Sequence, residues 1–177
     1  MAKKRTIRTI PQERTPMREQ PAQERAKNFA EVACGYRLEE AVRESERCLL
    51  CPEQPCVAGC PVGIDIPGFI RKIGEKDFRG AYDVLTDTNL LPAICGRVCP
   101  QESQCEGVCT VGESLEPVAI GRLERWVGDR AIAERWTESC RMTRQVGPSA
   151  LDALVAKAVP QVGLLELPDP FDEVLGG

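Results

Sequence analysis

The sequence contains no histidine, and aromatic residues make up only 5 % of its 177 residues. The absence of histidine excludes Ser-His-Asp triads, haem held by histidine and most catalytic zinc sites. The scarcity of aromatic residues predicts a hydrophobic core that is lean for a chain of this length. The sequence also shows no apolar run of secretory-signal or transmembrane type, so we expect a cytoplasmic protein without direct membrane insertion.

The sequence has no excess of positive charge, since its formal net charge is −4. This balance argues against nucleic acid as the main partner. Charged residues at 28 % and hydrophobic residues at 42 % are typical of a globular domain rather than of a wholly disordered chain.

No alternating strand pattern of any length is present, whereas helical spacing of apolar residues recurs. This spacing predicts helices within 23–47, from Pro67, after Asp77, over 117–135 and over 150–159, with a short turn opened by Pro92. We therefore expect a mostly α fold, in which residues 23–135 form a small, loop-rich α-helical ferredoxin-like domain. Residues 1–22 are basic and interrupted by proline, which predicts an extended arm, and residues 136–177 predict a helix followed by an extended acidic-apolar tail.

The ten cysteines are the feature that points to chemistry, because eight of them fall into two dense groups. These are Cys48-x2-Cys51-x4-Cys56-x3-Cys60-Pro61 and Cys95-x3-Cys99-Pro100-x4-Cys105-x3-Cys109. In a reducing compartment, clustered thiols favour metal binding over disulfides, and thiolates select iron-sulfur clusters, zinc or cuprous copper. Structural zinc usually needs two separated C-x2-C pairs, and only one is present here. Two 4Fe-4S clusters are the favoured interpretation, and zinc is the alternative.

The spacing also predicts how the ligands divide between the two clusters. In a two-cluster ferredoxin, three close cysteines bind one cluster and the cysteine before proline binds the other. On this rule the first cluster takes Cys48, Cys51 and Cys56, and the second takes Cys60, Cys99, Cys105 and Cys109. The first cluster then needs a fourth ligand, for which the candidates are Cys95, the less favoured Cys34 and Cys140, and Glu124. Glu124 falls on or beside the apolar stripe of the helix expected over 117–135, where a carboxylate is costly unless it is paired or bound to metal.

Several short motifs occur in a fixed order around these cysteines. They include Pro16-Met17-Arg18-Glu19-Gln20, Arg47-Cys48-Leu49-x-Cys51, Leu91-Pro92-Ala93-x-Cys95-Gly96-Arg97-Val98-Cys99-Pro100 and Pro117-Val118-Ala119-Ile120-Gly121-x-Leu123-Glu124-Arg125. Over residues 15–135 the chain resembles the N-terminal two-cluster domain of the glutamate synthase small (beta) subunit. The same domain begins the large subunit of NADH-dependent reduced ferredoxin:NADP oxidoreductase and, more distantly, dihydropyrimidine dehydrogenase.

The resemblance implies an α-helical fold with two 4Fe-4S clusters that relay electrons between flavins. It further implies that Glu124 is the fourth ligand of the first cluster and that Cys95 is not a ligand. In that family a flavin and NAD(P)H module follows, whereas residues 136–177 show no G-x-G-x-x-G motif. We therefore expect that this chain itself binds no flavin or NAD(P)H and contributes no catalytic residue.

The expected function is that of an electron-transfer subunit. It would relay single electrons through two 4Fe-4S clusters between the redox centres of a multisubunit oxidoreductase, with flavoprotein or iron-sulfur subunits as partners. The alternative is a metal-held scaffold or a cluster-based redox sensor, and the spare thiols of Cys34, Cys95 and Cys140 are the feature that suggests a sensor.

Overall fold

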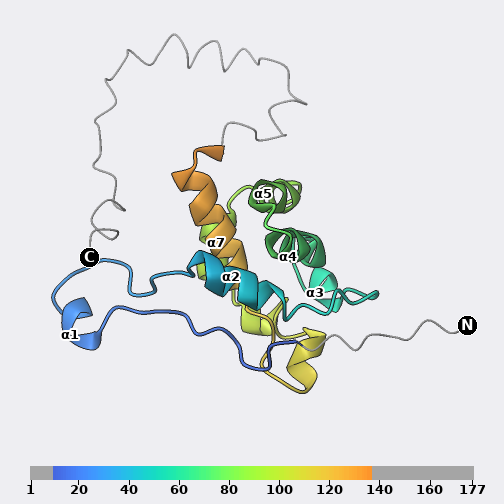
Figure 1. Ribbon diagram of the computed structural model, residues 1–177, viewed down its shortest axis with the longest axis horizontal. Helices are drawn as coiled ribbons and strands as arrows, with labels where there is room; N and C mark the ends of the chain where they lie inside the picture. The colour runs from blue at the N-terminus through green and yellow to red at the C-terminus, as the bar shows by residue number, and fades with distance from the viewer. Residues whose placement is uncertain (1–9, 137–177) are drawn as a thin grey trace, which may run out of the picture. The chain divides into compact units, whose positions relative to one another are not determined.

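The computed structural model describes residues 10–136, and this part of the chain consists of helices and loops (Figure 1). It contains no β-strand, only one isolated bridge between Glu19 and Ala33, which confirms the mostly α fold class. The helices are α1 (Ala22–Arg25), α2 (Leu38–Ser45), α3 (Pro55–Ala58), α4 (Ile66–Gly74), α5 (Phe78–Thr86), α6 (Pro92–Val98) and α7 (Ile120–Ala133), with 3-10 turns η1 (Gln101–Ser103) and η2 (Thr110–Glu113). Within residues 10–136, no helix has both the length and the apolar character needed to cross a membrane. The helix expected over 150–159 lies outside the described residues.

Two aspartates begin the paired helices α4 and α5. The carboxylate of Asp65 accepts a hydrogen bond from the Gly68 N–H, and that of Asp77 accepts one from the Gly80 N–H, both at 2.9 Å. Each bond satisfies a backbone donor that the first turn of a helix leaves free. The helices predicted from Pro67 and after Asp77 are therefore confirmed, and their inner faces bury Phe69, Ile70, Ile73, Ala81 and Leu85.

Helix α7 lies at the centre of the core and packs closely on α6. The predicted apolar stripe of α7 is confirmed, since Ile120, Leu123, Val127 and Ala131 are all buried. Glycines permit the close approach, because a Cβ atom at Gly96 would lie 2.4 Å from the Arg125 backbone nitrogen. The helix begins at Ile120 rather than near Pro117, because neighbouring side chains bind the backbone of the preceding residues.

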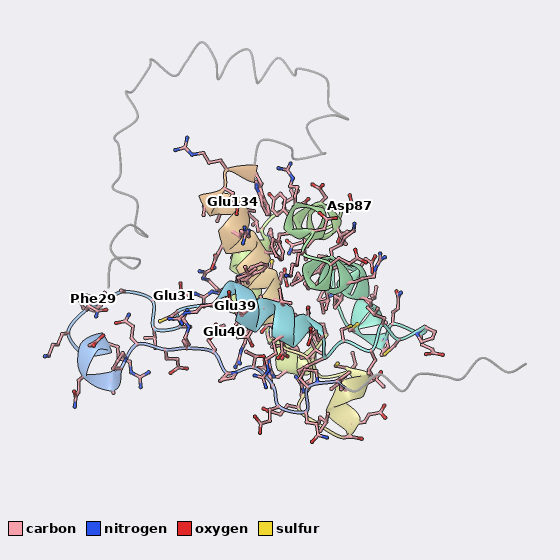
Figure 2. All side chains as sticks on the ribbon, in the orientation of Figure 1. Phe29, Glu31, Glu39, Glu40, Asp87 and Glu134 are labelled. Carbon is pink, nitrogen blue, oxygen red and sulfur yellow. The ribbon has the colours of Figure 1, made fainter. Side chains whose placement is uncertain are left out.

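The helical spacing within 23–47 is confirmed after Gly35, where α2 forms, but most of the helix expected before Gly35 is absent. Helix α1 ends soon after Arg25, since the Asn28 amide donates to the Glu24 carbonyl and accepts from the Ala30 N–H. Phe29, expected on a buried helical face, is fully exposed and extends from the N-terminal segment (Figure 2). A second difference concerns residues 92–98, where the expected short turn is the helix α6.

A buried ion pair ties the N-terminal segment to the helices. Glu44 and Arg47 are both completely buried, and their side chains meet at 2.9 Å. Glu44 also accepts hydrogen bonds from the backbone N–H groups of Thr15 at 2.7 Å and Ala119 at 2.9 Å. Arg47 donates to four backbone carbonyls, those of Pro11, Gln12, Glu116 and Pro117. The two charges are therefore fully hydrogen-bonded, as buried charges must be.

Candidate metal centres

A first group of four cysteines lines one apolar pocket. Cys48 follows α2, Cys51 lies in the next loop, Cys56 lies in α3, and Cys109 immediately precedes η2. Apolar side chains complete the wall of this pocket, namely Leu49, Pro55, Ile66, Pro67, Ile70, Val111, Val118 and Ile120. The four thiols thus come from segments that are more than fifty positions apart in the sequence and meet in a water-poor environment.

The loop between Cys48 and Cys56 has an unusual backbone. Leu50 has φ 54° and Gln54 has φ 45°, which are left-handed values that side chains other than glycine rarely adopt. These two residues turn the chain on either side of Cys51. The Cys51 thiol lies within hydrogen-bond distance of the Thr110 hydroxyl oxygen, with Sγ and Oγ1 3.5 Å apart.

Burial lowers the acidity of one thiol in this first group. Desolvation, together with the neighbouring thiols of Cys48 and Cys109, raises the pKa of the Cys56 thiol to about 11. A thiolate is therefore costly in this pocket unless positive charge is supplied there. A metal ion or cluster core supplies such charge and deprotonates thiols that bind to it.

A second group contains Cys60, Cys99, Cys105 and Glu124. Burial is the main cause that raises the pKa of Cys99 to about 11 and that of Cys105 to about 12. Cys60 and Glu124 lie near enough to both thiols to raise these pKa values as well. Cys95 lies beside Cys99, which it also affects through a hydrogen bond.

Glu124 is the buried carboxylate of this second group. Its side chain projects from α7 and the residue is only 5 % exposed. Within residues 10–136 no cationic side chain pairs with it, although Arg125 next to it pairs with Glu31 and Asp129. Its hydrogen-bond partner is the amide of Asn89, whose Nδ2 donates to Oε1 over 2.6 Å. Burial raises the pKa of Glu124 to about 7, and the Asn89 hydrogen bond offsets part of that rise.

The structure divides the eight predicted ligands differently from the expected division. Cys109, expected with Cys60, Cys99 and Cys105, lies with Cys48, Cys51 and Cys56. Glu124, expected with the first triple, lies with the second. The reason is the turn after Cys105, where the Cys109 N–H donates to the Glu106 carbonyl and the chain returns toward the Cys48 loop. Among the other candidates, Cys95 lies at the edge of the second group, Cys34 is exposed, and Cys140 is outside the described residues.

Within residues 10–136, no three acidic or cysteine side chains converge tightly enough to bind one metal ion. The four ligands of a 4Fe-4S cluster bind four different iron atoms and so lie further apart than the ligands of a single ion. Thiols are the usual ligands of such clusters, so the seven thiols and the Glu124 carboxylate are a donor set of the kind that holds 4Fe-4S clusters.

The sequence patterns do not predict two polar residues at these sites. Thr110 contacts the first group and Asn89 the second. Neither belongs to a spacing pattern, although Thr110 follows Cys109 directly and Asn89 lies shortly before the motif that contains Cys95 and Cys99.

The fold and the cysteine-rich sites define a small helical iron-sulfur domain, and comparison with known proteins agrees. Residues 25–136 match the family model described as dihydropyrimidine dehydrogenase domain II, 4Fe-4S cluster. The chain belongs to this family, which confirms the resemblance inferred from the motifs.

Three relatives illustrate the match. The glutamate synthase [NADPH] small chain of Halomonas elongata is 40 % identical over 116 residues, covering 66 % of this chain and 25 % of that protein. The corresponding small chain of Azospirillum brasilense is 36 % identical over 130 residues, covering 73 % and 27 %. The NAD-dependent dihydropyrimidine dehydrogenase subunit PreT of Escherichia coli K12 is 44 % identical over 89 residues, covering 50 % and 22 %. The matched region thus spans about a quarter of each relative.

Proposed function

We propose that this domain binds two 4Fe-4S clusters and transfers single electrons through them within an oxidoreductase complex. One cluster is held by Cys48, Cys51, Cys56 and Cys109, and the other by Cys60, Cys99, Cys105 and Glu124. The observation that carries the proposal is the convergence of seven thiols and one buried carboxylate, drawn from three separate stretches of the chain, into two groups of four.

The two sites share short segments of chain, which supports a relay. Cys56 belongs to the first group and Cys60, two positions after the end of α3, to the second. Cys105 and Cys109 connect the two groups in the same way. Because only three residues separate the two cysteines of each connection, the two sites are neighbours, and neighbouring clusters exchange electrons readily.

The surrounding residues would influence the reduction potentials of the two clusters. A 4Fe-4S cluster accepts and releases one electron, at a potential that depends on its ligands, hydrogen bonds and burial. The lining of the first pocket is largely apolar, while the second site offers one oxygen donor in place of sulfur. The different donor sets would give the two clusters different potentials.

The partner is proposed from the relatives. Their names identify subunits that use NADPH or NAD, and in each of them most of the chain lies outside the matched region. We therefore propose a flavoprotein or another iron-sulfur subunit of an oxidoreductase as the partner that supplies or receives the electrons.

Anaerobic purification of the full chain tests the cluster assignment. We expect about eight iron atoms and eight acid-labile sulfides per chain, since each cubane contains four of each. C56S should disturb only one cluster and C60S only the other, as seen by electron paramagnetic resonance (EPR), whereas C34A should leave both unchanged. Bound zinc without sulfide, or C56S and C60S acting on the same cluster, would refute the assignment.

Electron transfer is tested separately. The chain should co-purify from its host with an oxidoreductase subunit, and both clusters should be reduced when that complex receives its own electron donor. Clusters that stay oxidised in the intact, working complex would exclude the relay and favour the scaffold or sensor.

A further inference from the structure

Asn89 contacts both Glu124 of the second group and the thiol of Cys95, which is not among the proposed ligands. It lies between α5 and α6 and is only 6 % exposed. Its Nδ2 donates to Glu124 Oε1 over 2.6 Å, and its Oδ1 accepts from the Leu91 N–H over 2.9 Å. The same Oδ1 lies 3.5 Å from the Cys95 thiol, which donates to it.

The backbone determines which way this amide points. The Leu91 N–H can only donate, so it requires the oxygen of the Asn89 amide and places the nitrogen on the opposite side. The nitrogen can only donate, and it faces a carboxylate oxygen that can only accept when ionised. The loop therefore fixes the amide, and the amide in turn fixes Oε1 of Glu124. Within the described residues Oε2 receives no such hydrogen bond and remains available to iron.

The same amide engages a competing ligand. Sulfur is the usual donor for iron-sulfur clusters, and Cys95 lies beside Cys99 at this site. As long as the Cys95 thiol donates to Asn89, its sulfur is engaged by that amide and not by a cluster. The hydrogen bonds of the Asn89 side chain to Glu124 and Cys95 thus favour the Glu124 oxygen over the Cys95 sulfur as the fourth ligand.

We propose that Asn89 is a positioning residue that holds Glu124 as the fourth ligand of the second cluster and keeps Cys95 out of its coordination. This inference rests on the proposed function, because it presumes a cluster at Cys60, Cys99, Cys105 and Glu124. It predicts that Asn89 changes the properties of this cluster without affecting the other one.

Two variants at Asn89 remove different parts of the arrangement. N89L has a similar size and loses every polar contact. N89D keeps the oxygen for Leu91 and Cys95, so the loop is preserved, but it sets a second carboxylate against Glu124. T88D is the matched control, because it introduces the same charge one position away, at an exposed residue.

The measurement is an EPR-monitored redox titration of the full chain, combined with iron and sulfide analysis. We expect N89L and N89D to change the g-values of one cluster and to lower its midpoint potential, because a hydrogen bond to the ligand oxygen is lost. The other cluster and the T88D control should match the native protein. If N89D, with full iron content, gives native spectra and midpoints for both clusters, the inference is overturned while the proposed function stands.

Cys95 provides the second arm of the test. C95A alone should keep the native iron content, whereas C95A combined with N89L should lose more iron than N89L alone, since no sulfur can replace a displaced Glu124. Loss of iron from one cluster in C95A alone would make Cys95 a ligand and overturn the inference. A wild-type chain without iron would instead refute the proposed function itself.

Discussion

Individual side chains at the two sites act through single hydrogen bonds, and Thr110 is the simplest case. Its Oγ1 lies 3.5 Å from Cys51 Sγ, where the thiol donates. When Cys51 binds iron as a thiolate it has no proton to give, so the hydroxyl must become the donor. A hydrogen bond to a ligand sulfur stabilises the reduced, more negative state and raises the potential.

Replacing Thr110 with valine should therefore lower one midpoint potential. If the bond differs by about 1 kcal/mol between the two redox states, T110V shifts the cluster at Cys48, Cys51, Cys56 and Cys109 by roughly −40 mV. T110S keeps the hydroxyl and should remain near the native value. An EPR-monitored titration that finds T110V and T110S identical would show that this bond does not form in the loaded protein.

Single residues also show what the sequence could and could not reveal. The cysteines and Glu124 could be found because metal ligands must be of particular types at short spacing. Their division between the sites could not, since the position of Cys109 depends on a turn that brings it back to the Cys48 loop. Asn89 and Thr110 carry no pattern of their own, because a single polar residue has no periodicity to detect.

At the scale of elements, the closeness of α6 and α7 controls the second site. Helix α7 carries Glu124, and α6 carries Cys95 and leads into Cys99. A Cβ atom at Gly96 would lie 2.4 Å from the backbone nitrogen of Arg125, which directly follows Glu124. Any side chain at position 96 must therefore move one helix relative to the other.

We expect G96A to destabilise the domain by roughly 1–3 kcal/mol, the usual cost of overpacking a core. It should also alter the EPR signal of the cluster at Glu124, because that residue moves with α7. G74A is the matched control, since its Cβ would lie 3.4 Å from Ser45 Oγ and a helical Gly-to-Ala change stabilises by up to about 1 kcal/mol. Denaturant unfolding of the loaded proteins measures both effects. Equal stability of G96A and the native chain would mean that α6 and α7 are not packed as described.

The helices themselves could be predicted where an apolar stripe coincides with a good N-terminal signal. Asp65 with Pro67, and Asp77, provide such signals for α4 and α5. The stretch from Ala26 to Arg37 has helical spacing of apolar residues but is not helical. Hydrogen bonds from the Asn28 side chain to nearby backbone groups compete with helix formation there. In α7 the apolar stripe was predicted correctly. The residue at which the helix begins could not be predicted, because it depends on Glu44, a residue distant in sequence.

At the scale of the molecule, the clusters would act as internal cross-links. The first site joins residues 48–56 to Cys109, and the second joins Cys60, the segment 99–105 and α7. The chain has few aromatic residues, so its core offers limited hydrophobic stabilisation on its own. Ligand bonds that exist only in the folded protein then contribute directly to the free energy of folding.

Removing the iron and sulfide should therefore unfold the domain or lower its Tm by roughly 10 °C or more, equivalent to about 2 kcal/mol. The difference should depend on pH. In the metal-free protein, burial raises the pKa of Cys56 to about 11 and that of Cys105 to about 12, so these thiols are protonated near neutrality. The loaded form has released those protons, hence the metal-free form binds more of them and acid favours it.

The Tm difference between loaded and metal-free protein should consequently shrink as the pH falls from about 8 to about 6. Circular dichroism melts under anaerobic conditions, with iron content measured at each pH, follow this difference directly. C34A serves as the control, because the exposed thiol of Cys34 lies outside both groups and its loss should leave the trend unchanged. A Tm that is the same with and without clusters across this range would show that the helices hold the ligands in place unaided, and that the clusters do not contribute to the stability of the fold.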